Sequence, residues 1–132
     1  MKIREVFIKD KRGQSLIEFA LVLPILLLVV FGITEFGRAI MVKNVLHTAS
    51  REGARLAAVR PVSDSLSVLA RVQEVLDAAN ITPKEITIQF DVAAKSVAVT
   101  VTADFEVLSA GVLDPFMGTF ELKGKTVMRY EG

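Results

Sequence analysis

The chain has 132 residues, of which 52% are hydrophobic, and its formal net charge at pH 7 is +1. This length allows one small domain plus one anchoring segment, and the weak charge argues against a nucleic-acid-binding surface. The sequence contains no cysteine, which excludes disulfides, thiolate metal sites and cysteine nucleophiles.

The N-terminal part has the pattern of a membrane anchor. The first thirteen residues form a basic head with a net charge of +3, and the stretch from Phe19 to Ile33 then carries no charged side chain. A helix needs about 20 apolar residues to cross a bilayer core. We therefore predict a span over about residues 16–35, with the basic end in the cytoplasm and the rest of the chain outside. The alternative is a buried helix of a soluble core, which an all-round apolar surface does not favour.

The span is expected to belong to a helix that runs from Ser15 to about Val59. Pro24 lies inside it, where proline removes one backbone hydrogen bond, so we expect a kink there. Beyond the span the helix becomes amphipathic, and Pro61 ends it. Its predicted apolar stripe consists of Val42, Val45, Leu46, Ala49, Gly53 and Leu56.

A second helix is predicted from Ser63 or Asp64 to Asn80, with one of these two residues capping its first turn. Pro83 lies beyond its end. Its predicted apolar stripe consists of Leu66, Leu69, Val72, Val75, Leu76 and Ala79.

The hydrophobic period then changes from that of a helix to that of a strand. Apolar residues alternate with polar ones over 86–90 and again over 96–107, which predicts a hairpin with one buried face. A third strand is expected over 119–130, with Gly124 marking a bulge or a turn. The fold class is thus α+β: a long N-terminal helix, a second helix, and an antiparallel sheet of three or four strands.

Catalytic chemistry has little support in this sequence. His47 is the only histidine and lies near the polar side of the first helix, where a solvated residue is expected rather than a general base. No cluster has metal-ligand spacing and no glycine-rich loop could cradle a phosphate, so neither an enzyme nor a cofactor is predicted.

The junction at Gly13, Gln14 and Glu18 is the strongest candidate for a functional site. A carboxylate at the rim of a membrane span is costly, so Glu18 calls for an explanation. Cleavage between Gly13 and Gln14 would supply one, because the new amine of Gln14 could then be neutralised by Glu18 of a neighbouring subunit. The alternative is a boundary residue whose carboxylate reaches the lipid headgroups.

Glu35 and Arg38 form a second candidate at the other end of the span. Their spacing of three residues fits an interfacial ion pair, and an assembly contact is the alternative.

The residues of this N-terminal part are similar to those of a known family. The runs RGQSLIEFALVLP (residues 12–24), GITEFGR (32–38) and ASREGAR (49–55) resemble the TadE-like family of pseudopilins, or minor pilins, of the bacterial tight adherence (Flp) pilus. The resemblance covers roughly residues 12–59. Its motifs are specific because the glycine cut site, the fifth-position glutamate and the proline-bearing span occur in order. Many members have aspartate at the position of Glu35, where the acidic character is kept.

This resemblance implies a pilin-like protein with three parts. Residues 1–13 would be a leader that a prepilin peptidase removes, residues 14–41 a transmembrane and assembly helix, and residues 42–132 an extracytoplasmic domain. Glu18 would match the family's fifth-position glutamate. The implied location is the bacterial inner membrane or the pilus itself. The implied partners are the peptidase, other pilin subunits, the inner-membrane assembly platform and the lipid bilayer, with no nucleic acid.

A competing hypothesis is an uncleaved, membrane-anchored binding or scaffold protein. Its contact would be the apolar loop from Gly111 to Gly118, which also fits a simple plug at the end of a small core.

Overall fold

The computed structural model describes residues 11–107 and 118–131, with the side chains of residues 11 and 12 left out. The chain divides into two compact units between Glu35 and Phe36. Helix α1 covers Lys11–Val59, so its first part belongs to one unit and its remainder to the other. The α+β class predicted from the sequence is confirmed, and so is the end of the first helix at Val59.

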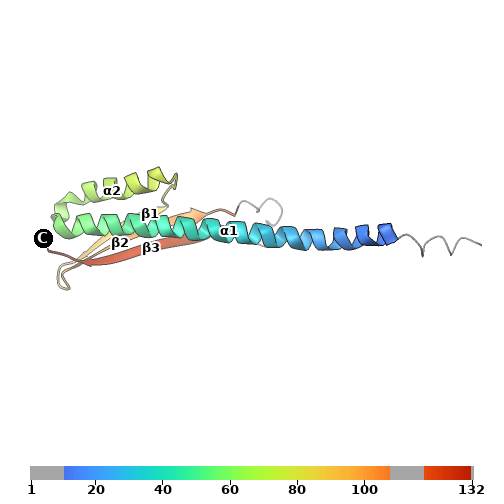
Figure 1. The fold of residues 1–132 in the computed structure, drawn as a ribbon. Coiled ribbons are helices and arrows are strands. Elements are labelled where there is room, and N and C mark those ends of the chain that lie inside the picture. Colours follow the sequence, from blue (N-terminus) through green and yellow to red (C-terminus); the bar gives the residue numbers. More distant parts are fainter. Residues whose placement is uncertain (1–10, 108–117, 132) are drawn as a thin grey trace, which may run out of the picture. The chain divides into compact units, whose positions relative to one another are not determined.

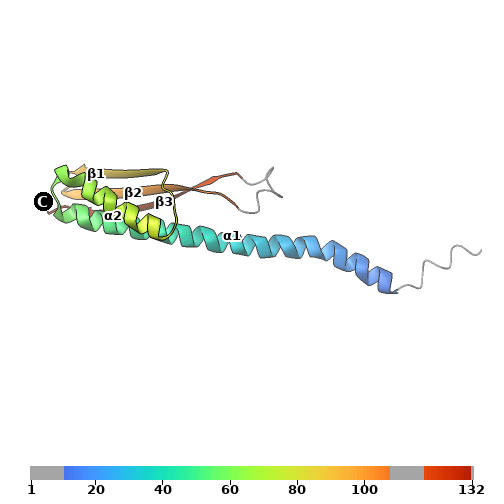
Figure 2. The same ribbon diagram turned by 90° about the horizontal axis from the view of Figure 1, so that it is seen from above.

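The second unit is a helix pair on a sheet. After α1 come a 3-10 turn at Val62–Asp64, helix α2 at Ser65–Ala78, and three strands: β1 at Glu85–Asp91, β2 at Ser96–Phe105 and β3 at Phe120–Arg129. The strands form an antiparallel sheet in the order β1-β2-β3. Figures 1 and 2 show the second part of α1 together with α2 on one side of this sheet.

The core lies between the helices and the inner face of the sheet. The predicted alternation in β2 is confirmed, since its valines at 97, 99 and 101 are fully buried. They pack with residues of the α1 stripe and of α2, as in the cluster of Leu46, Ala49, Ala54, Val72, Leu76, Val99, Val101 and Ala103. Each of these contacts removes apolar surface from water, which is the main force that holds so small a unit together.

The start of α2 differs from the expectation. Leu66 is 77% exposed, whereas Val68, which the predicted stripe omitted, is buried. Val68, Val72 and Leu76 follow one another at intervals of four residues, so the buried stripe continues the predicted one and begins at Val68 instead of Leu66. Asp64 is the N-cap residue but makes no side-chain cap hydrogen bond; its Oδ2 accepts a hydrogen bond from Arg60 Nη1 at 2.9 Å instead.

Two glycines mark the closest approaches within the second unit. A Cβ atom at Gly53 would lie 2.5 Å from Val72 Cγ2, so this glycine allows α1 and α2 to pack closely. Gly124 does not mark a bulge or a turn: β3 passes through it in regular register, opposite Val101. A Cβ atom there would lie 2.5 Å from the backbone carbonyl of Leu46, so Gly124 lets α1 rest directly on β3.

A buried hydrogen bond fixes the same helix–strand contact. Ser50 is fully buried, and its Oγ donates to the His47 carbonyl at 2.9 Å and lies 2.8 Å from Thr126 Oγ1. Satisfied polar groups of this kind specify one packing arrangement, because an unpaired hydroxyl in the core would be costly.

Candidate functional site

The predicted cleavage junction lies within α1 rather than before it. The sequence predicted a helix from Ser15, whereas α1 begins at Lys11 and includes both Gly13 and Gln14. Both residues are exposed. Glycine lowers the stability of a helix by about 1 kcal/mol relative to alanine, so Gly13 reduces the cost of unwinding the junction. A protease that binds extended backbone requires such unwinding.

Gln14 and Glu18 lie four residues apart, which places them on the same face of α1. The Glu18 side chain is exposed, as are the side chains around it on this helix. The geometry is thus compatible with a contact between Glu18 and another molecule. The roles of Gly13, Gln14 and Glu18 stay predictions.

Pro24 lies inside α1, where the helix continues through it. Proline has no N–H to offer, so the Ala20 carbonyl loses its normal helical partner. In a membrane such a carbonyl needs another partner. The kink at Pro24 stays a prediction.

The helix between the junction and Phe36 is apolar and uncovered. Among the described residues, one helix is long and apolar enough to cross a membrane, with a mean hydropathy of 2.8 over its most apolar window. No residue of that window is buried. An apolar surface of this extent must be covered by lipid or by other protein.

Arg38 lies just beyond this apolar stretch and fastens the end of β2 to α1. Its Nη2 donates to the Glu106 carbonyl at 3.3 Å, and its guanidinium carbon lies 4.8 Å from the centroid of the buried Phe105 ring. The sequence predicted an ion pair with Glu35, which stays a prediction. The contact with Phe105 was missed because 67 residues separate the two positions and no local pattern joins them.

We expect Arg38→Ala to loosen the end of β2 by about 1 kcal/mol, the sum of one exposed cation–π contact and one hydrogen bond. Hydrogen exchange of the amides at residues 105–107 should accelerate about fivefold. The Arg38→Lys variant should exchange at a rate between those of the unchanged chain and of Arg38→Ala, because lysine keeps the charge but lacks the planar guanidinium. Arg55→Ala is the matched control, since Arg55 pairs within α1 with Glu52 at 3.1 Å. Equal exchange in the Arg38→Ala and Arg55→Ala variants would contradict this role.

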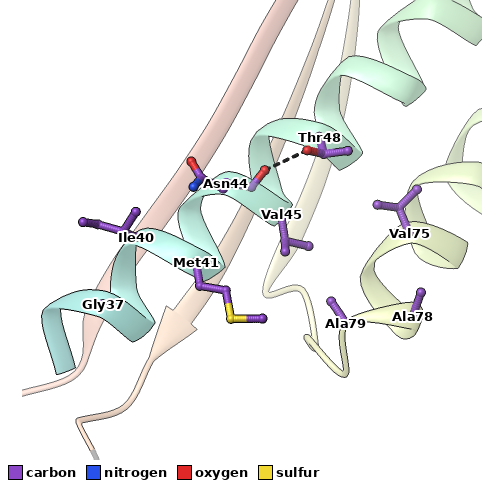
Figure 3. Close-up of a pocket in the computed structure, with 9 residues that line it drawn as sticks. All are labelled: Gly37, Ile40, Met41, Asn44, Val45, Thr48, Val75, Ala78 and Ala79. Atoms are coloured by element: carbon purple, nitrogen blue, oxygen red, sulfur yellow. Dashed lines mark hydrogen bonds between the residues drawn. The ribbon is translucent and has the colours of Figure 1, made fainter. Parts of the chain in front are cut away.

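A shallow groove of about 500 Å³ lies beside Arg38, between α1 and the end of α2. Figure 3 shows Met41 and Val45 of α1 on one side and Val75 and Ala78 of α2 on the other. The Thr48 hydroxyl donates to the Asn44 carbonyl within α1 at 2.9 Å, as the dashed line in Figure 3 shows. The lining is Gly37, Ile40, Met41, Asn44, Val45, Thr48, Val75, Ala78 and Ala79. None of these residues is titratable, so the groove offers a packing surface and no acid–base chemistry.

The sequence reasoning missed this groove. The available signal was the pair of alanines at 78 and 79, whose small side chains leave space opposite Met41.

The other candidate residues are placed as follows. His47 is exposed on α1, as expected for a solvated residue. Within residues 11–107 and 118–131, no group of three or more His, Asp or Glu could hold a metal ion. The apolar loop predicted as a contact, from Gly111 to Gly118, lies outside the described residues except for Gly118 itself.

The fold and the junction together define a class of protein: an α+β protein whose long, apolar N-terminal helix fits a membrane anchor. The family model described as TadE-like protein matches residues 13–55, from the junction to the part of α1 that belongs to the second unit. The resemblance inferred from the sequence is confirmed over this segment. No curated protein and no solved structure matches the chain significantly.

Proposed function

We propose that the chain is a structural assembly subunit, a pseudopilin or minor pilin, of a tight adherence pilus or a related secretion machine. In this role it contributes to pilus biogenesis and, through the pilus, to adhesion and surface colonisation. The observation that carries the proposal is the Gly13–Gln14 junction, with Glu18 at the head of an apolar helix that the other described residues leave uncovered. The family match begins at this junction, with Gly13 as its first residue.

The proposed topology follows from the charge and the apolar stretch. The basic end stays in the cytoplasm, the helix crosses the inner membrane once, and the α+β domain of residues 42–132, called the outer domain below, lies outside. A prepilin peptidase cuts between Gly13 and Gln14. The freed helix then exchanges lipid for the helices of other pilin subunits at the inner-membrane assembly platform. In the membrane such packing depends on close contact and on paired polar groups rather than on the hydrophobic effect.

N-terminal sequencing tests the processing step. We expect protein extracted from the membranes of cells with an active prepilin peptidase to begin at Gln14. The same chain from cells without that peptidase should begin at or near Met1, which is the control. An intact leader in the presence of the active peptidase would contradict the proposal and favour the uncleaved binding protein.

A further inference from the structure

The outer face of the sheet, which faces away from α1 and α2, carries an ordered pattern of charge. The strand registers place its residues in rows that cross all three strands. One row runs Glu85–Thr102–Lys123, and another runs Asp91–Ser96–Arg129. Each of these rows therefore begins with an acid on β1 and ends with a base on β3.

The acids and the bases of these rows lie on opposite edges of the sheet. In the described part of the chain, β1 and β3 each pair only with β2, so both are edge strands. The acidic edge is defined by Glu85 and Asp91 on β1. The basic edge is defined by Lys123, Lys125 and Arg129 on β3. All five side chains are exposed.

The other charges on this face are largely paired among themselves. Lys84 Nζ lies 3.0 Å from Asp104 Oδ1 and 3.1 Å from Glu121 Oε2. Hydrogen bonds and charge, first from Asp104 and then from Glu121, raise the pKa of Lys84 above its usual value. Lys95 is in the turn after Asp91 and lies outside both rows. This cluster carries one base and two acids, and the contrast between the two edges persists beside it.

The charge pattern disfavours contact between the β1 edges of two copies or between their β3 edges, and it favours contact between a β1 edge and a β3 edge. Two β1 edges brought together antiparallel about Ile88 would place Glu85 against Asp91, and two β3 edges would gather six bases. Like charges directly opposite each other destabilise a strand pair, and opposite charges stabilise it. Edge lysines commonly prevent random strand association in this way.

The spacing along the two edges also matches. Glu85 and Asp91 are six residues apart, and so are Lys123 and Arg129. Because β1 and β3 both run antiparallel to β2, they run parallel to each other. A neighbouring copy with the same orientation, as copies inserted in the same sense into one membrane have, would therefore present its basic edge in register with the acidic edge.

We propose that the acidic β1 edge of one copy lies against the basic β3 edge of a second copy, with Glu85 opposite Lys123 and Asp91 opposite Arg129. The third row, Gln89–Ala98–Val127, supports this arrangement: Val127 is an apolar side chain left 57% exposed on the basic edge, and Gln89 of the next copy covers it. The contact joins different surfaces of the two copies, so it repeats along an open array rather than closing a dimer. The inference rests on the proposed assembly function.

Cysteine cross-linking of the full-length chain in membranes tests this contact, and the natural chain contains no cysteine to interfere. Directly opposite residues on adjacent strands lie about 5 Å apart, within reach of a disulfide. We expect a chain with both Gln89→Cys and Val127→Cys to form dimers and larger oligomers on oxidation. Mixed chains that carry one substitution each should form dimers, and either single variant alone should not.

Several outcomes would overturn the proposal. Efficient cross-linking of one single variant to itself would show like edges in contact. An adduct whose mass is not that of two copies would show a different partner. The absence of cross-links in the double variant would show that the edges do not meet.

Charge reversal provides the second measurement. Glu85→Lys in the double-cysteine chain should reduce cross-linking about tenfold, because an attraction becomes a repulsion. Adding Lys123→Glu should restore cross-linking, whereas the control Glu74→Lys, on α2, should leave it unchanged. No reduction with Glu85→Lys, or no restoration by the second change, would contradict the charge pairing.

The same gel separates this proposal from the proposed function, because cleavage shortens the chain. A cut chain without cross-links would overturn only the edge contact, and an uncut chain with cross-links would overturn only the processing.

Discussion

Gly124→Ala should destabilise the outer domain by about 2–3 kcal/mol, at the upper end of the usual cost of overpacking. The added methyl group would lie 2.5 Å from the Leu46 carbonyl carbon and oxygen and 2.7 Å from the His47 nitrogen. These are backbone atoms of a helix, which cannot turn aside as a side chain can. The helix must instead move off β3, and this movement opens the core around the fully buried Leu46 and Ala49.

The midpoint of heat unfolding of the outer domain, followed by its resistance to protease in detergent, should fall by about 10–20 °C. Gly118→Ala is the matched control, because a Cβ atom at Gly118 meets nothing within 4 Å. Equal midpoints for the two variants would contradict the close contact between α1 and β3.

The outer domain's elements were predictable because local patterns encode them. The alternation along β2 identifies its buried valines, and Pro61 lies just beyond the end of α1. Both signals depend only on neighbouring residues, through the period of a strand or the geometry of proline.

The contacts between elements were less predictable. The bulge or turn predicted at Gly124 is wrong, because the sequence shows only that a side chain is missing there and the Leu46 backbone that fills the space is 78 residues away. Leu66 was predicted in the α2 stripe in place of Val68 because both are apolar residues of the first turn, and the local pattern does not tell which of them the rest of the fold covers. The contact between Arg38 and Phe105 was not predicted, because the two residues lie 67 positions apart in the sequence.

The order of the charges across the sheet is another feature that the sequence alone did not predict. The bases of β3 were predicted to face away from the core, whereas Glu85 and Asp91 fell outside the first predicted strand, which covered 86–90. Their order across the sheet depends on the register, which pairs Thr102 with both Glu85 and Lys123. One residue of slip in β3 would turn its bases toward the core. The Gly124 contact with Leu46 opposes such a slip, because only glycine fits at that point. The same glycine therefore supports both the core and the outer charge pattern.

Replacement of Glu18 by Gln or Ala should leave cleavage at Gly13 intact and reduce incorporation into pili about tenfold or more. The cut depends on backbone access at the junction, whereas Glu18 lies beyond it on the exposed face of α1. After cleavage each subunit brings a positive amine at Gln14 into a low-dielectric helix bundle. If the neighbouring carboxylate is missing, this amine is unpaired, and breaking one partner of a buried pair costs about 3–5 kcal/mol.

The measurement is the amount of the chain in the sheared pilus fraction relative to the membrane fraction, together with its N-terminal sequence. Glu106→Gln removes one negative charge from the outer domain and is the control, with normal incorporation expected. Normal pili from both Glu18 variants would contradict charge pairing and leave Glu18 as a carboxylate that reaches the headgroups. Loss of cleavage would instead assign Glu18 to recognition by the peptidase. Glu18→Gln keeps the size of the side chain and removes only its charge, so this variant separates electrostatics from packing.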